Sequence, residues 1–473
     1  MTSDGLDALQ RTDTPHGEEE REQFDDENRL KAEFVRAVAQ AIENDDDTLA
    51  YDLVEPLHPA DIADLFELIG RDDRAALAKA ISDLMTSEVI AELNDHVRED
   101  MIEALPPEAV AEIAEQLETD DAVQLLEDLD ADDQAAVLAE MDAEDRAAIE
   151  TALSYPEETA GRLMQRDLVA VPEHMTVGDL IDYLRENSDL TTEFWEVFIV
   201  DPQHHPVGTC QLSWVMRTPR HIALADVMKR DQTLIPVGMD QEEVALRFQK
   251  YALISAAVVD DSGRLVGQIT VDDVVHIIEE EASEDIMRLS GAGDGDINEP
   301  IMLTVRSRLS WLVVNLGTAI LASSVVGIFQ DAIAKFALLA VLMPIVSGMG
   351  GNAGTQTLAV VVRALATNQL TSSNTWRMIM RELRIALTNG AALGLMIGGG
   401  TALLFSYPML GLVIGAAMVI NNLTAGLMGI IVPVTLERMK IDPAVSSSVF
   451  VTTATDVMGF FSFLGLAVLA GLA

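Results

Sequence analysis

The chain has 473 residues, 49% of them hydrophobic and only 5% aromatic, and its formal net charge is −48. This length allows two to four domains. The 78 Asp and Glu residues against 30 Lys and Arg exclude a nucleic-acid-binding protein, because contacts to phosphate depend on Lys and Arg.

The negative charge is concentrated in the first part of the chain. Residues 301–473 contain five acids and nine bases, for a net charge of +4, whereas residues 1–300 carry −52. An acidic surface attracts metal cations and raises their local concentration. Only six of the bases are Lys, and such a composition is also typical of proteins adapted to high cytoplasmic salt. Both interpretations of the acid excess stay open at this point.

The first 30 residues are polar and acidic and have no apolar core, so we expect no signal peptide. We predict a disordered acidic tail over residues 1–28. The single cysteine, Cys210, excludes an intramolecular disulfide bond and is typical of a reducing compartment.

Short amphipathic segments follow, and we predict an α-helical domain over residues 29–160. Three 12-residue units between residues 118 and 153 open with acids, which suit an N-cap, and continue with apolar residues at helical spacing. Two similar segments, residues 57–69 and 105–117, carry Pro near the first turn. Stacked short helices form a solenoid, in which most acids are expected to be caps or solvated side chains.

The pattern then changes to a helix followed by two short strands, and it occurs twice. The first copy is VGDLIDYLRENS with FWEVFIVDPQHHPVGT, and the second is EEVALRFQKYAL with SAAVVDDSGRLVGQIT. The two copies resemble a tandem pair of cystathionine-β-synthase-type (CBS) domains. We place the pair at residues 161–270, divided at about 161–224 and 225–270.

The second copy ends in GQITVDD, which matches the G-x-x-T-x-x-D pattern of nucleotide-binding CBS domains. The resemblance implies that Gly267, Thr270 and Asp273 bind the ribose and phosphate of ATP or another adenine nucleotide. The first copy has Ser213 but Met216 at the position of the acid, so we expect no such site there.

Residues 301–473 predict five membrane spans. About 20 apolar residues are needed to cross the hydrocarbon layer, and the uncharged run from Ile385 to Leu436 is too long for one crossing. We place a turn at Tyr407 and Pro408, because Pro cannot continue a helix. The predicted spans are about 309–330, 336–362, 385–405, 409–436 and 445–472.

The basic residues give the orientation in the membrane through the positive-inside rule. Eight of the nine bases lie before the first span, between the second and third, or between the fourth and fifth, and Lys335 alone lies on the other side. We therefore expect a multi-pass protein of the cell (inner) membrane with its acidic half in the cytoplasm. With five spans, the C-terminus lies outside.

The fifth span contains Asp456, and a carboxylate in hydrocarbon is costly unless it is compensated. In the second span Gly350, Gly351 and Asn352 follow Pro344. A double glycine loosens a helix and can turn carbonyls toward an ion pathway. The alternatives are close helix packing by small residues and a protonated Asp456 bonded to a neighbouring helix.

Along nearly its whole length the chain resembles the MgtE-type magnesium channels and transporters. The resemblance rests on the domain order and on five stretches: YPEETAGRLM, DQEEVALRFQKYAL, VDDVVHIIEEEASEDIMRL, PIVSGMGGNAGTQ and DPAVSSSVFVTTATDVMGF.

The fold implied by this resemblance is a multidomain membrane protein. An all-α transmembrane bundle of five helices per subunit is joined by a plug helix to a cytoplasmic α-helical solenoid and α/β tandem CBS domains. The plug helix and a linker occupy residues 271–300, with the helix itself at about 271–289. The protein is expected to be a homodimer with the pore on its two-fold axis.

The resemblance also implies two kinds of Mg²⁺ site. In the pore, two Asp456 carboxylates meet on the two-fold axis. Together with carbonyls of Gly350, Gly351 and Asn352 they hold a largely hydrated ion, and Asp442 lies at the cytoplasmic mouth. The regulatory acids implied are Asp240, Glu242, Asp273, Glu281, Glu284 and Asp285. Ala252 stands where this family often has an acid after the preceding Tyr, so one regulatory site is expected to be weaker or missing. The resemblance does not identify which solenoid acids bind regulatory Mg²⁺.

The predicted function is a Mg²⁺-gated channel, without enzymatic activity, that carries Mg²⁺ into the cytoplasm and closes when cytoplasmic Mg²⁺ binds. One alternative is a secondary transporter of Mg²⁺, Mn²⁺ or Co²⁺ coupled to Na⁺ or H⁺, although a proton relay normally uses more than one intramembrane acid. The other is a membrane-anchored sensor of Mg²⁺ or nucleotide, which Asp456 argues against. The sequence has no Walker motif, so we expect no ATP-driven pumping.

Overall fold

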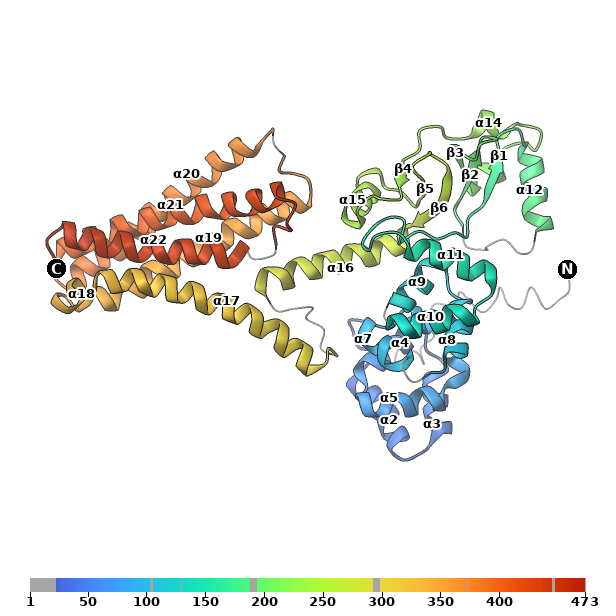
Figure 1. Cartoon of the computed structure of the whole chain (residues 1–473), viewed down its shortest axis with the longest axis horizontal. Coiled ribbons are helices and arrows are strands. Elements are labelled where there is room, and N and C mark those ends of the chain that lie inside the picture. The colour runs from blue at the N-terminus through green and yellow to red at the C-terminus, as the bar shows by residue number, and fades with distance from the viewer. Residues whose placement is uncertain are drawn as a thin grey trace. The chain divides into compact units, whose positions relative to one another are not determined.

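The computed structural model describes residues 23–102, 105–127, 129–187, 194–291, 298–371, 373–444 and 447–472. The chain divides into two compact units, Met1–Ile277 and Ile278–Ala473 (Figure 1). Most of the expected disordered tail, residues 1–22, lies outside the described residues. The rest of it is described, and there Phe24 pairs with Leu30 in an isolated β-bridge.

The predicted α-helical domain is coloured blue to cyan in Figure 1. One apolar core runs through its helices, with Phe66, Leu77 and Leu125 among the fully buried side chains. The helices are α2 (Ala32–Glu43), α3 (Asp47–Val54), α4 (Pro59–Leu68), α5 (Arg71–Ala80), α6 (Ser87–Ala91), α7 (Asp95–Ile102), α8 (Pro107–Ala114), α9 (Thr119–Glu127), α10 (Ala131–Glu140) and α11 (Ala143–Leu153), with a 3₁₀ turn at Ser82–Leu84.

The three predicted 12-residue units correspond to α9, α10 and α11, so these helices are confirmed. Each has two acids in its first turn, where the positive end of the helix dipole favours them. The expected capping bonds differ. Asp130 and Asp142 occupy N-cap positions, yet neither side chain accepts a capping hydrogen bond, whereas Asp46 caps α3 by accepting from the backbone N of Leu49 at 3.1 Å.

The predicted tandem of α/β units is confirmed as two copies of one topology. In each described sheet the first two strands are parallel and the last two antiparallel, with a register shift at the same place, Ile199/Val200 and Val258/Val259. The strands are β1 (Ala170–Pro172), β2 (Glu196–Val200), β3 (Pro206–Gln211), β4 (Leu234–Pro236), β5 (Ser255–Val259) and β6 (Leu265–Thr270), and the helices are α12 (Val177–Glu186), α13 (Leu212–Arg217), α14 (Leu224–Val227) and α15 (Gln241–Tyr251).

A single long helix, α16 (Val271–Ser290), begins directly after β6, where the plug helix is predicted. Val274 and Ile277 are buried in the core of the second CBS unit. Leu289 packs against a cluster of the transmembrane unit that includes Leu358. The boundary between the two compact units therefore falls inside one continuous helix.

Five of the described helices are long and apolar enough to cross a membrane, as predicted. Two of them start earlier than the predicted spans, at Ile301 and Thr375, and carry Arg residues near their N-terminal ends. An uncharged run marks the part of a helix that crosses hydrocarbon and not its full length. The helices are α17 (Ile301–Ile328), α19 (Leu338–Ala366), α20 (Thr375–Leu404), α21 (Pro408–Arg438) and α22 (Ser447–Leu469), with the short α18 (Gln330–Lys335) between the first two.

The predicted turn between the third and fourth spans is also present. Ser406 has a positive φ of 55°, and Pro408 is the first residue of α21. The two helices then pack closely, because Gly398 faces the backbone of Gly411 and leaves no room for a Cβ atom. Small residues in these spans thus serve helix packing.

Candidate ion pathway and acidic cluster

Asp456 lies in the middle of α22 and is half-buried in the transmembrane unit. Its Oδ1 accepts a hydrogen bond from the hydroxyl of Ser347 on α19. A hydroxyl donor stabilises an ionised carboxylate, but one neutral donor does not neutralise a charge in hydrocarbon. The described transmembrane helices place no basic side chain in an ion pair with Asp456.

The double glycine in α19 does not interrupt the helix, which is continuous from Leu338 to Ala366. Gly350 is buried against α21, where a Cβ atom would overlap the side-chain amide of Asn421. A Cβ on Gly351 would meet nothing within 4 Å among the described residues. Gly350 is thus explained by packing, whereas Gly351 and the exposed Asn352 lie on a face of α19 that this single subunit leaves open.

Two buried amides of α21 were not singled out as site residues by the sequence. Asn421 donates from Nδ2 to the carbonyl O of Val346 at 2.8 Å, and Asn422 donates to that of Met418 at 2.9 Å. Within the described part of the chain neither Oδ1 has a hydrogen-bond partner. The feature of the sequence that could have identified them is the pair of adjacent Asn residues in a span that otherwise consists of apolar and small residues.

Asp442, predicted at the cytoplasmic mouth, is held by a basic residue of α16. Its Oδ2 lies 2.6 Å from Nη1 of Arg288, and its Oδ1 accepts from the backbone N of Ala444 at 2.7 Å. Arg288 also forms an ion pair with Glu284, one turn earlier in the helix. Two predicted metal ligands, Asp442 and Glu284, are thus joined through one guanidinium. Glu281 makes other contacts, and the side chain of Asp285 lies outside the described part of the structure.

In the first unit, acids at the start of α9 lie near acids at the start of α16. Burial, followed by the charge of Asp273, raises the pKa of Glu118 from 4.5 to about 7. Burial and the charge of Asp273 also raise the pKa of Asp120 well above its usual value. Burial raises the pKa of Asp121 too, against the lowering effect of Arg98. Proximity and burial therefore make ionisation of these carboxyls costly.

Asp273 completes this acidic cluster, which we define as Glu118, Asp120, Asp121, Asp272 and Asp273. Burial, opposed by a hydrogen bond from Thr270, raises the pKa of Asp273 from 3.8 to about 6. Its Oδ2 accepts from the hydroxyl of Thr270 at 2.6 Å and from Nε2 of Gln165 at 3.2 Å. The solenoid acids that lie near Asp273 are therefore those that open α9.

The donor set of the acidic cluster suits Mg²⁺. All donors are carboxylate oxygens, which are hard ligands, and Oδ1 of Asp120 is buried without a hydrogen-bond partner among the described residues. Among the described residues, no group of three or more His, Cys, Asp or Glu side chains lies in an arrangement that could hold a metal ion.

Other predicted site residues have local structural roles. Asp240 is the N-cap of α15 and accepts from the backbone N of Glu242 at 3.0 Å. Neither residue contributes to the pKa shifts within the acidic cluster. A Cβ on Gly267 would lie 2.8 Å from the carbonyl O of Gln165, which gives this glycine a packing role. Ala252 ends α15 in the left-handed region, with φ of 51°.

Three family models match the chain. A divalent cation transporter model, MgtE, matches residues 343–466, the MgtE intracellular N domain matches residues 57–158, and a CBS domain matches residues 224–280. The last of these covers the second CBS copy, and the fold described above shows the first copy as well.

Curated relatives of the chain are named magnesium transporter MgtE. The protein from Thermus thermophilus is 32% identical over 322 residues, which are 67% of this chain and 71% of that protein. The protein from Enterococcus faecalis is 31% identical over 315 residues, 67% of this chain and 70% of that protein. A solved cytosolic domain of the Mg²⁺ channel MgtE in complex with ATP is 27% identical and covers 51% of this chain and 99% of that chain, with a TM-score of 0.47.

Proposed function

The chain belongs to the MgtE family of magnesium transporters, and from this premise we propose that it is a channel for Mg²⁺ that cytoplasmic Mg²⁺ closes. The ion enters the cytoplasm along its electrochemical gradient. The acidic half lies in the cytoplasm, and with five membrane helices the C-terminus lies on the opposite side. The observation that carries the proposal is the half-buried Asp456 in α22, which has a hydroxyl partner and no basic one among the described residues.

The ion site requires two subunits. One carboxylate carries half the charge of Mg²⁺, and a two-fold axis brings a second copy of the same residue to it. The open face of α19, with Gly351 and Asn352, supplies further oxygen atoms in a homodimer. Because Mg²⁺ loses water reluctantly, the paired Asp456 carboxylates select a largely hydrated ion by charge.

Gating follows from the acidic cluster. Without a cation, the ionised carboxyls of α9 and α16 repel each other, and burial together with this repulsion raises the pKa values of Glu118 and Asp273. Bound Mg²⁺ replaces repulsion by bridging, so the arrangement in which α9 lies against the start of α16 becomes more populated. The helix α16 continues without a break to Arg288, which forms an ion pair with Asp442 in the transmembrane unit. One continuous helix therefore connects the acidic cluster to the transmembrane unit.

An adenine nucleotide is the second proposed regulator. Thr270 and Asp273 are hydrogen-bonded to each other and to Gln165, so the groups of the G-x-x-T-x-x-D pattern are brought together. The surrounding acids repel phosphate and favour contact with ribose hydroxyls at Asp273. Nucleotide and Mg²⁺ therefore act on overlapping residues.

Currents through the purified protein in a planar bilayer test this function against coupled transport. A channel carries Mg²⁺ current that reverses at the Mg²⁺ equilibrium potential and is unchanged by a pH or Na⁺ gradient. A reversal potential that moves with the pH or Na⁺ gradient identifies a coupled carrier instead. Raising Mg²⁺ on the cytoplasmic side should reduce the open probability, which a carrier without a gate would not show.

A further inference from the structure

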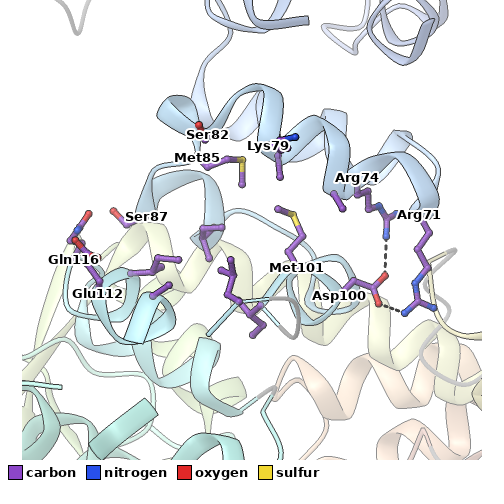
Figure 2. A pocket seen from close by; sticks show the side chains of 17 residues that line it. Arg71, Arg74, Lys79, Ser82, Met85, Ser87, Asp100, Met101, Glu112 and Gln116 are labelled. Carbon is purple, nitrogen blue, oxygen red and sulfur yellow. Dashed lines mark hydrogen bonds and ion pairs between the residues drawn. The ribbon is translucent and has the colours of Figure 1, made fainter. Parts of the chain in front are cut away.

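We propose that a pocket in the helical domain binds the segment Asp4–Arg11 of the same chain. The pocket has a volume of about 730 Å³ and lies among α5, α6, α7 and α8. Figure 2 shows Arg71, Arg74 and Asp100 at one end, Met85 and Met101 in the middle, and Ser87, Glu112 and Gln116 at the other end. A volume of this size suits a short apolar segment with a few polar contacts.

The charge of the pocket is opposite to that of its surroundings. Residues 29–160 contain 37 acids and 8 bases, yet three of those bases line this one pocket together with only two acids. Asp100 forms ion pairs with both Arg71 and Arg74, and Arg74 also donates to the carbonyl O of Phe66 at 3.0 Å. Arg71 stays largely exposed, and Lys79 is exposed and has no ion pair in the described structure. With three bases and two acids, the pocket lining has a net positive charge inside an acidic domain, which favours an acidic ligand.

The walls between the two polar ends are apolar and adaptable. Ala75, Ala78, Ile90 and Ile113 line the pocket beside two methionines, and Met side chains adjust to irregular apolar ligands. The ligand therefore has an acidic end and an apolar centre, and Glu112 at the far end favours a base there.

The segment before the described residues has these groups in this order. It reads DGLDALQR from Asp4 to Arg11, with two acids, then Leu6 and Leu9 three residues apart, then a base. In one direction along the pocket, Asp4 and Asp7 meet Lys79 and Arg71, the two Leu side chains meet the methionines, and Arg11 meets Glu112. Apolar anchors at i and i+3 are a common mode of peptide recognition.

The connection between Arg11 and the described chain is long. The described chain begins at Gln23, with Phe24 packed against the domain core, and α2 packs directly against α5, which lines the pocket. The 12 steps from Arg11 to Gln23 span up to about 40 Å at about 3.3 Å per residue. Because the segment is tethered, its effective concentration at the pocket is in the millimolar range, so weak contacts suffice for docking.

Protection of an engineered thiol tests the proposal in the full-length protein. The native Cys210 is buried, and burial raises its pKa to about 11, so it reacts slowly with maleimide. In Leu9→Cys the new thiol should react at least about tenfold more slowly than in Thr14→Cys, which lies outside the docking segment; tenfold corresponds to about 1.4 kcal/mol. Lys79→Glu in the Leu9→Cys background should restore the fast rate, and Leu6→Asp should do the same.

Arg36→Glu is the matched control, since it makes the same charge change on an exposed base of the same domain that does not line the pocket. It should leave the protection intact. Equal rates for Leu9→Cys and Thr14→Cys would overturn the proposal and leave the pocket to a lipid or another protein. Protection that survives Lys79→Glu, or that Arg36→Glu also removes, would equally contradict docking in this pocket.

Discussion

Arg288 near the end of α16 forms an ion pair with Asp442, between α21 and α22, with 2.6 Å between Nη1 and Oδ2. About a third of each side chain remains exposed, so the pair is of moderate strength. It attaches the plug helix to the transmembrane unit through a resident cation, and it occupies two acids, Glu284 and Asp442, that otherwise attract Mg²⁺.

Removing this cation should loosen closure in the absence of Mg²⁺. Arg288→Gln should raise the open probability in Mg²⁺-free solution by up to about fivefold, the factor given by about 1 kcal/mol for a partly exposed ion pair. Closure by cytoplasmic Mg²⁺ should then become more pronounced, because both acids are free to bind it. Single-channel recording measures both quantities. Arg306→Gln, on the same side of the membrane but without an ion pair in the described structure, serves as the control, and an effect equal to that of Arg288→Gln would contradict the role of the pair.

The acidic cluster should make the first unit pH-dependent when Mg²⁺ is absent. The folded-state pKa of Glu118 is raised from 4.5 to about 7, and that of Asp273 from 3.8 to about 6. The folded state therefore binds protons more tightly than the unfolded state, so stability is fully present below about pH 4 and is lost as pH rises toward 7. Hydrogen exchange of α9 amides, corrected for intrinsic rates, should become faster over this range, and Mg²⁺ should restore protection at pH 7.

Glu118→Gln should remove part of this pH dependence and weaken the protection by Mg²⁺. Asp132→Asn, which changes an exposed acid in the first turn of α10, should change neither. If the two variants behave alike, the acids of α9 have no special role and the acid excess reflects adaptation to salt.

Two adjacent glycines of α19 give a sharp comparison of packing. Gly350→Ala places a methyl group against the amide of Asn421 and should destabilise the folded bundle by about 1–3 kcal/mol, as overpacking does. Gly351→Ala meets open space in the subunit and should leave the thermal unfolding midpoint in detergent nearly unchanged. A reduced Mg²⁺ current in folded Gly351→Ala would support its place at the ion pathway. Equal unfolding midpoints for the two variants would show that the contact between α19 and α21 is not as described.

Nucleotide binding is testable by thermal stability. ATP at millimolar concentration should raise the unfolding midpoint of the first unit in the full-length protein, by an amount that grows with its concentration. Thr270→Val should reduce the shift, because the Thr270 hydroxyl holds Asp273 at 2.6 Å. A shift that is the same in wild type and Thr270→Val would place the nucleotide elsewhere.

The sequence predicts those features that are written in local patterns. Runs without charge give five spans, and repeated helix and strand patterns give the CBS pair, since both depend on residues close in the chain. The starts of α17 and α20 are missed because their N-terminal parts contain Arg residues but are still helical. The cap at Asp240 is local too, and it competes with the proposed role of this residue as a metal ligand.

Contacts between distant segments are what the sequence does not provide. From the sequence alone, Gly350 is interpreted as a residue that loosens its helix. In the structure the side chain of Asn421, 71 residues later, fills the space beside its Cα. The acids of α9 look like their neighbours in α10 and α11 in the sequence, but in the fold burial and the approach of Asp273 raise the pKa of Glu118 and Asp120. Ser347 is one of several small polar residues in its span, and it is distinguished only by its bond to Asp456.

The most direct test of the proposed function is the Mg²⁺ current of Asp456→Asn in the reconstituted protein. The amide has the shape of the carboxylate and can still accept a bond from Ser347, but it removes the charge that we propose selects the ion. Mg²⁺ current should fall below detection, while the oligomer mass and the unfolding midpoint stay those of the wild type. Ser347→Ala, which keeps the charge, should retain a measurable current. Wild-type Mg²⁺ current through folded Asp456→Asn would contradict the assignment of this carboxylate as the ion-selecting group.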